Sequence, residues 1–219
     1  SLGIDEFDAL DYVDIMGDVT SFAGAMQVSI KRARKAGEGE YNPADYLPVS
    51  ENSTDDMYAQ LLTMIHSVKN PYLSALLKKL FVEDEEFLQV FKGHSAAKTV
   101  HHGFIGGLME HTLSVSRLCD YMAGAYPLLK RDLLISAALL HDIGKTRELS
   151  PFPINDYTDE GQLLGHIVIG SQMIHDMARE IPDFPVDLEN QLIHCILAQS
   201  RRAGIRFPEK NRRLRKLWL

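Results

Sequence analysis

The chain has little cysteine and no long apolar run. Only two of its 219 residues are cysteine, Cys119 and Cys195, and they do not form a Cys-x-x-Cys pair. A disulfide framework is therefore not expected, and this cysteine usage fits a reducing cytoplasm. No stretch approaches the roughly 20 apolar residues that a membrane span needs, so we expect no membrane partner. The acidic start of the sequence lacks the basic region of a signal peptide.

Basic side chains are scarce in most of the sequence, and this limits how it can bind nucleic acid. The net charge is −7 at pH 7, but residues 201–219 contain eight Lys or Arg and one acidic residue. Residues 1–200 therefore carry 15 basic and 29 acidic side chains. Such an acidic body argues against broad electrostatic binding of nucleic acid, although it leaves room for a local groove or a metal site.

The first part of the chain has the pattern of β-strands. Residues 12–19 and 26–31 have strand composition, and a turn is expected at 21–25. We therefore expect a β segment over residues 1–40. Residues 36–53 contain two Gly and two Pro, and residues 41–53 are expected to form a linker.

From Ser53 onward the apolar residues recur with helical spacing, and 45% apolar residues overall suffice for a sizeable core. Asn70-Pro71 ends one expected helix and starts the next. The fold class predicted for residues 54–198 is therefore mostly α. We expect helices near residues 54–68, 71–80, 83–91, 105–125, 131–144, 162–180 and 186–198.

The strongest chemical signal is the segment 139–145, LLHDIGK, in which an apolar helix delivers His141 and Asp142. Imidazole and carboxylate suit a divalent transition-metal ion, and the carboxylate can bridge two ions. Gly144 is expected to end the helix and to leave Lys145 free to meet a phosphate. A single His-Asp pair is weak support, because His175-Asp176 is a second copy that we interpret as an exposed surface pair.

Two further histidines strengthen this interpretation. His111 follows the segment GGLME, and His166 lies in the segment LGHI. Each lies on an apolar helix, where an unpaired polar group is costly. Three separate hydrogen-bonded core histidines are the alternative, but their order around the His141-Asp142 pair favours a shared metal site.

In this order, His111 and His141-Asp142 resemble the HD superfamily of metal-dependent phosphohydrolases. The phrase HHGFIGGLMEHT at 101–112, with LLHDIGKTREL and GHIVIG, resembles one branch, the YhaM-type 3′–5′ exoribonucleases, over about residues 10–198. The resemblance implies an HD-domain helical bundle over 54–198, and the β segment is similar to the end of an OB-fold nucleic-acid module, whose first half is not recognised.

The resemblance also implies roles for particular residues. The implied metal ligands are His111, His141, Asp142 and His166. Asp142 and Lys145 would be catalytic, and Lys145 would also contact substrate. His101 and His102 would bind substrate or lie near the site, with a capping or packing role as the alternative. Manganese is the family's usual ion, and iron, nickel or zinc would also accept these ligands.

RNA or another single strand is the implied substrate, and a homo-oligomer is allowed. The local candidates for strand binding are Lys31, Arg32, Arg34 and Lys35, although such charges are more often simply solvated. Two other functions stay open: a phosphodiesterase acting on small nucleotides, and a non-catalytic HD module. The remaining histidines have no assigned role: His194 is interpreted as structural, and His66 and His94 have no visible partners.

After Leu197 the sequence departs from this family. The family continues with a phrase like SHHGELEFGSPK and a long helix bearing a final Asp ligand, whereas residues 199–214 read QSRRAGIRFPEKNRRL. One allowed set of codons for these residues, read one base later, encodes SHGELEFGSPKKTAV. We hypothesise that residues 199–219 are a frameshift product; the alternative is a natural basic tail that binds nucleic acid.

This departure affects the expected activity. No Asp follows Asp187, and Gln199 and Ser200 stand where the family has a late histidine. The chain is therefore expected to be a weak or inactive catalyst. Residues 199–219 are not expected to form the family's final long helix, because their apolar residues make no helical stripe.

Overall fold

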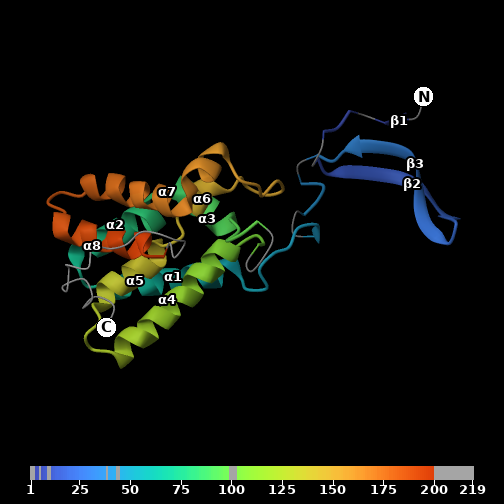
Figure 1. Cartoon of the computed structure of the whole chain (residues 1–219). Coiled ribbons are helices and arrows are strands. Elements are labelled where there is room, and N and C mark those ends of the chain that lie inside the picture. Colours follow the sequence, from blue (N-terminus) through green and yellow to red (C-terminus); the bar gives the residue numbers. More distant parts are fainter. Residues whose placement is uncertain are drawn as a thin grey trace. The chain divides into compact units, whose positions relative to one another are not determined.

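A computed structural model describes residues 3–4, 6–8, 11–37, 39–42, 45–98 and 103–199. It divides into two compact units, an N-terminal unit (Ser1–Pro48) and a helical unit (Val49–Leu219). Figure 1 shows strands in the first and helices in the second, so the expectation of a mostly α fold with a short β segment is confirmed. The expected segment 199–219 lies outside the described residues, apart from Gln199.

The N-terminal unit is a three-stranded sheet. Its strands are β1 (Gly3–Ile4), β2 (Val13–Phe22) and β3 (Ala25–Lys35), in the order β1-β3-β2. β2 runs antiparallel to β3, and β1 runs parallel to it. The turn is shorter than expected: only Ala23 and Gly24 lie outside the ladder. Their φ angles of 50° and 84° give the two-residue turn that matches the strand twist.

One face of this hairpin carries apolar side chains in alternation. The ladder pairs Val19 with Val28 and Ile15 with Ala33, so the apolar side chains project to the same side. Alternation of this kind is typical of a sheet with one buried face. Within the described residues, however, Ile15, Val19 and Val28 are each at least half exposed.

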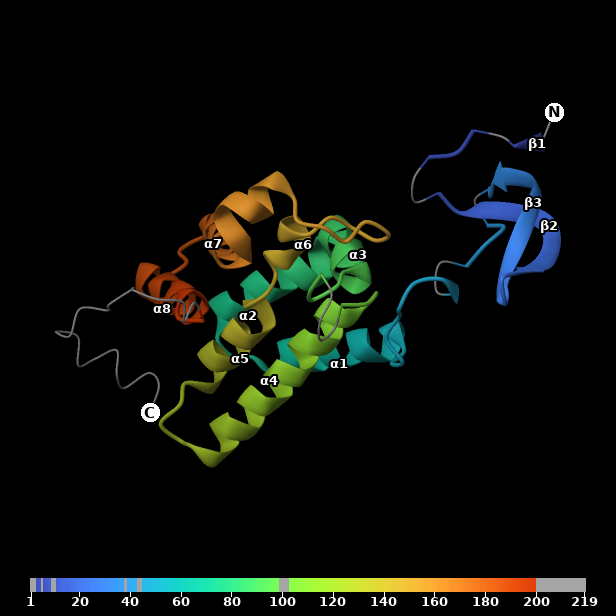
Figure 2. The same ribbon diagram turned by 45° about the vertical axis from the view of Figure 1, so that its right-hand side comes forward.

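The helices of the helical unit are α1 (Thr54–Ser67), α2 (Pro71–Lys78), the π-helical turn η2 (Lys79–Glu83), α3 (Glu85–Gly93), α4 (Gly107–Ala125), α5 (Arg131–Leu140), α6 (Lys145–Glu148), α7 (Asp159–Arg179) and α8 (Val186–Leu197). Both views, in Figures 1 and 2, show α4 and α5 side by side. None of the helices in the described part of the chain combines the length and apolar content needed to cross a membrane.

The core of the helical unit comes from the apolar stripes of these helices. Met57, Leu61 and Ile65 recur at four-residue spacing on α1 and are buried. Phe81 and Phe91 pack edge to face, with ring centroids 5.1 Å apart. Most of α5 is buried in this core, and the His141-Asp142 pair follows its last residue.

One helix ends earlier than the sequence indicated. We expected a helix over 131–144, but α5 ends at Leu140, and a turn over 141–144 leads into the short α6. The backbone N–H of Lys145 donates to the carbonyl of Asp142, which closes this turn. His141 and Asp142 therefore follow the last residue of α5, and the backbone of His141 still has helical angles, φ −60° and ψ −34°.

Candidate metal centre

Two imidazole rings and one carboxylate meet in the helical unit. His111 Nε2 lies 3.2 Å from His141 Nε2 and 3.3 Å from Asp142 Oδ2. His141 Nε2 lies 3.1 Å from the same carboxylate oxygen. Asp142 is 4% exposed, whereas the two histidines are only partly buried. One ligand atom from each residue therefore faces a common point at the edge of the core.

Two packed helices position these side chains. α4 begins directly after Gly106, whose φ of 83° lies in the left-handed region that favours glycine. His111 lies in the second turn of α4, and His141 and Asp142 follow the last residue of α5. Because α4 and α5 pack along each other, residues 30 positions apart in the sequence meet.

The arrangement fits a divalent metal ion. Nδ1 of His141 lies 2.7 Å from the carbonyl oxygen of Ala138, which can only accept, so this nitrogen donates and Nε2 keeps its lone pair. Metal bonds of about 2.0–2.2 Å to imidazole and carboxylate put neighbouring ligand atoms about 3 Å apart. The three separations at this site are 3.1, 3.2 and 3.3 Å. The donor set and its spacing therefore suit a divalent ion.

The carboxylate of Asp142 is ionised in this setting. Burial raises the pKa of Asp142, but the adjacent imidazole rings of His111 and His141 lower it by more. The nearby ammonium of Lys145 lowers it further, so the pKa lies far below its ordinary value. We expected Lys145 to be free for a phosphate. Instead its Nζ lies 2.7 Å from Asp142 Oδ2 and neutralises the buried charge.

His166 faces the other oxygen of the same carboxylate. Its Nε2 lies 3.5 Å from Asp142 Oδ1, whereas His111 and His141 face Oδ2. The ring Nδ1 and the backbone N–H of His166 lie 2.9 and 3.0 Å from Oε1 of Glu148. His166 thus reaches Asp142 without joining the group of three residues whose ligand atoms converge.

Glycines let α7 come this close to the turn after α5. A Cβ on Gly144 would overlap the carbonyl of His166, and a Cβ on Gly161 would overlap the backbone of Glu148. Gly165 interrupts α7 directly before His166, with φ 74° and ψ 154°. A left-handed φ of this kind favours glycine.

The other predicted residues have different outcomes. His101 and His102, expected near the substrate, lie outside the described residues. His175 is about half exposed, and its Nδ1 lies 2.5 Å from Oε1 of Glu189 at the surface. Cys119 and Cys195 are free thiols whose pKa values burial raises, to about 11 for Cys195, so neither is an activated nucleophile.

His94 is better connected than its sequence context indicated. We saw no partner for it, but the buried ring has Nδ1 3.0 Å from the carbonyl oxygen of Ser95 and Nε2 3.1 Å from that of Leu149. The carbonyl of His94 also accepts from the backbone N–H of Leu108 in the first turn of α4. His94 therefore joins the start of α4 to the segment that follows α6.

A buried amide, also unpredicted, strengthens the same junction. Asn155 Oδ1 accepts from Ser95 Oγ at 2.5 Å, and its Nδ2 donates to the carbonyls of Ala97 and Lys98 at 3.3 and 3.2 Å. These partners lie 57–60 residues away in the sequence, so no local pattern indicates them. The network fixes the connection between α3 and α4 against the connection between α6 and α7.

The sequence is similar to known proteins. The family model described as HD domain matches residues 108–214. The 3′–5′ exoribonuclease YhaM of Bacillus velezensis is 33% identical over 200 residues, which cover 90% of this chain and 62% of that protein. The YhaM exoribonucleases of Bacillus licheniformis and Bacillus subtilis are each 34% identical, over 85% and 87% of this chain and 58% and 60% of their own lengths. The chain thus spans about three fifths of these relatives. No solved structure matches it.

Proposed function

Because the chain belongs to the HD superfamily, we propose that it is a metal-dependent phosphohydrolase that removes nucleotides from the 3′ ends of single-stranded RNA. The proposal rests on one observation above all: the ligand atoms of His111, His141 and Asp142 lie 3.1–3.3 Å from one another, the spacing that a shared divalent ion imposes. Manganese is the ion we propose, and the cytoplasm is the proposed location.

Each residue of the centre has a proposed role. His111, His141 and Asp142 would hold the ion. When bound, a divalent ion makes water a better nucleophile and stabilises charge on phosphate oxygens. Asp142 has its second oxygen free of this group and turned toward His166, so its carboxylate can serve two adjacent positions.

Lys145 is the proposed contact for the substrate's phosphate. Its ammonium lies beside Asp142, and the side chain is 15% exposed, which keeps the charge in a region of low dielectric. A positive charge held there stabilises the extra negative charge that a phosphate gains during hydrolysis.

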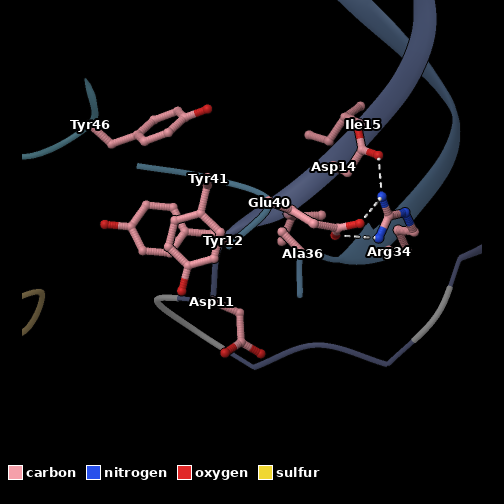
Figure 3. Close-up of a pocket in the computed structure, with 10 residues that line it drawn as sticks. Asp11, Tyr12, Asp14, Ile15, Arg34, Ala36, Glu40, Tyr41 and Tyr46 are labelled. Atoms are coloured by element: carbon pink, nitrogen blue, oxygen red, sulfur yellow. Dashed lines mark hydrogen bonds and ion pairs between the residues drawn. The ribbon is translucent and has the colours of Figure 1, made fainter. Parts of the chain in front are cut away.

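The N-terminal unit offers an aromatic surface for single-stranded RNA. Tyr12 stacks on Tyr41 with ring centroids 3.9 Å apart, and Tyr46 meets Tyr12 edge to face at 5.3 Å. These rings line a cavity of about 800 Å³, and Figure 3 shows them across from Arg34 and its two carboxylate partners. Nucleobases stack on such rings without regard to sequence.

Three of the four basic side chains expected to contact a strand are less available than we expected, and for the fourth, Arg32, no ion pair is seen in the described residues. Lys31 pairs with Asp18, and Lys35 pairs with Asp11. Arg34 pairs with both Asp14 and Glu40. Paired cations offer less charge to a phosphate backbone. We therefore propose the three tyrosines, rather than these cations, as the main strand contacts of the N-terminal unit.

The test is an exonuclease assay with manganese. A 5′-labelled oligoribonucleotide should shorten stepwise from its 3′ end, and Asp142→Asn should slow this by about 100-fold or more. Glu189→Gln, at the remote pair with His175, is the matched control and should leave the rate unchanged. Hydrolysis of free nucleotides or cyclic dinucleotides without shortening of the oligonucleotide would contradict the RNA proposal. It would show that the substrate is a small nucleotide.

A second comparison addresses the late ligands. A version of the chain with SHGELEFGSPKKTAV from residue 199 onward regains the histidine of the family phrase. We propose that this version is the faster enzyme. Equal rates for the two versions would mean that the late ligands are dispensable, and metal binding without hydrolysis in both would favour a non-catalytic module.

A further inference from the structure

Glu148 makes two hydrogen bonds to one residue, His166. Its Oε1 accepts from the ring Nδ1 of His166 at 2.9 Å and from the backbone N–H of His166 at 3.0 Å. The Glu148 side chain is 12% exposed, so water competes little for these bonds. Burial raises the pKa of Glu148, but the bonds from His166 lower it by more, and the net pKa is below its ordinary value.

The backbone N–H of His166 is available to Glu148 because α7 is interrupted at Gly165. The non-helical angles of Gly165, φ 74° and ψ 154°, end the first half of α7 just before His166. His166 therefore starts the second half, and the first N–H groups of a helix have no partner within it. The carboxylate of Glu148 supplies that partner and lies where the helix end is positive.

The ring bond decides which nitrogen of His166 can bind a metal. A carboxylate can only accept, so Nδ1 of His166 carries a proton, and in the neutral ring Nε2 keeps the lone pair. Nε2 is the nitrogen that faces Asp142, 3.5 Å from Oδ1. The oxygen Oδ2 of the same carboxylate faces the other two histidines.

From these contacts we propose that Glu148 is a positioning residue, which fixes the backbone and the tautomer of His166 so that Nε2 can bind a second divalent ion beside Asp142 Oδ1. The proposal rests on the metal-dependent function proposed above. A residue that only capped a helix would contribute to folding stability and leave the choice of ring nitrogen unchanged. Glu148 makes both bonds, so its loss should change the ring as well as the helix end.

The test uses Glu148→Ala and Glu148→Gln in the chain as it stands. Manganese binding is followed by calorimetry, and the His166 tautomer by nitrogen-15 NMR of the metal-free protein. The unaltered chain should bind two ions and show His166 with its proton on Nδ1. Glu148→Ala should weaken the second ion by about 10–100-fold, leave the first ion unchanged and give a mixture of tautomers. Glu148→Gln keeps an acceptor oxygen and should lie between the two.

The surface pair supplies the matched control. Glu189→Gln removes the charge from an analogous carboxylate–histidine pair with His175 and should change neither metal affinity nor the His166 tautomer. A second ion bound as tightly in Glu148→Ala, or an unaltered chain that binds one ion only, would overturn the proposal. A chain that binds no ion and cleaves no RNA would instead overturn the proposed function. If Glu148→Ala does not fold, manganese affinity and the His166 tautomer are measured in Glu148→Gln instead.

Discussion

Asn155 joins two connecting segments of the helical unit, and its backbone has a φ of 45°. It is 6% exposed, and its amide group bonds to Ser95 and to the carbonyls of Ala97 and Lys98. Removal of the amide leaves buried groups without partners, which costs about 1–3 kcal/mol. A left-handed φ adds about 1 kcal/mol for alanine but not for glycine.

We therefore expect Asn155→Ala to lower the free energy of unfolding by about 2–4 kcal/mol. Asn155→Gly should cost less, because glycine accepts the backbone angle and loses only the hydrogen bonds. Urea unfolding measures both. Asn190→Ala, at an exposed position of α8, is the control and should stay within about 0.5 kcal/mol of the unaltered chain. An equal effect of the changes at 155 and 190 would contradict this account.

The cysteines allow a second test at this scale. Burial raises the pKa of Cys195 to about 11, so roughly one thiol in a thousand is ionised at pH 8. Because the thiolate is the reactive form, Ellman's reagent should label native Cys195 slowly at pH 8 and rapidly in denaturant. Rapid labelling of the native chain would show that the thiol is not protected.

The sequence indicated the candidate metal ligands but not the residues that hold the surrounding backbone and rings in place. The convergence of His111, His141 and Asp142 could be predicted because each follows or lies on an apolar helix and their residue types suit a metal. Glu148 and His94 could not, because their partners lie 18 and 55 residues away and depend on how α7 and α6 pack. The tautomer of a histidine is a property of such contacts, and local sequence does not contain it.

Among the elements, α7 combines two glycine-dependent features. Gly161 lies against the backbone of Glu148, and Gly165 breaks the helix before His166. The sequence predicted a continuous helix near 162–180, since one glycine does not by itself end a helical pattern. The helix instead starts at Asp159, where Thr158 caps it by accepting from the N–H of Gly161.

Gly165→Ala should therefore be destabilising by about 1–2 kcal/mol, because alanine resists a left-handed φ. It should also weaken metal binding on the His166 side. Gly124→Ala in α4 is the matched control: a Cβ there meets no atom within 4 Å, and alanine favours the helix by up to about 1 kcal/mol. Urea unfolding and manganese calorimetry give both readouts. If Gly165→Ala behaves like Gly124→Ala, the break in α7 is not needed.

For the whole molecule, the two compact units suggest separate tasks. The metal centre lies entirely within the helical unit, and the tyrosine-lined cavity lies entirely within the N-terminal unit. Removal of residues 1–48 should weaken binding of single-stranded RNA and leave manganese-dependent hydrolysis of a small phosphodiester unchanged. Loss of both activities would show that the centre depends on the N-terminal unit.

The exposed apolar face of β2 and β3 should make the N-terminal unit the first part of the chain to open on heating. Side chains that stay in contact with water contribute little to folding, and a two- or three-stranded sheet without a buried face opens at small cost. Amide protons of the hairpin should therefore exchange with solvent long before those of α4 and α5. On warming, the N-terminal unit should melt first, so the proposed RNA binding should be lost at a temperature where the candidate metal centre is still intact.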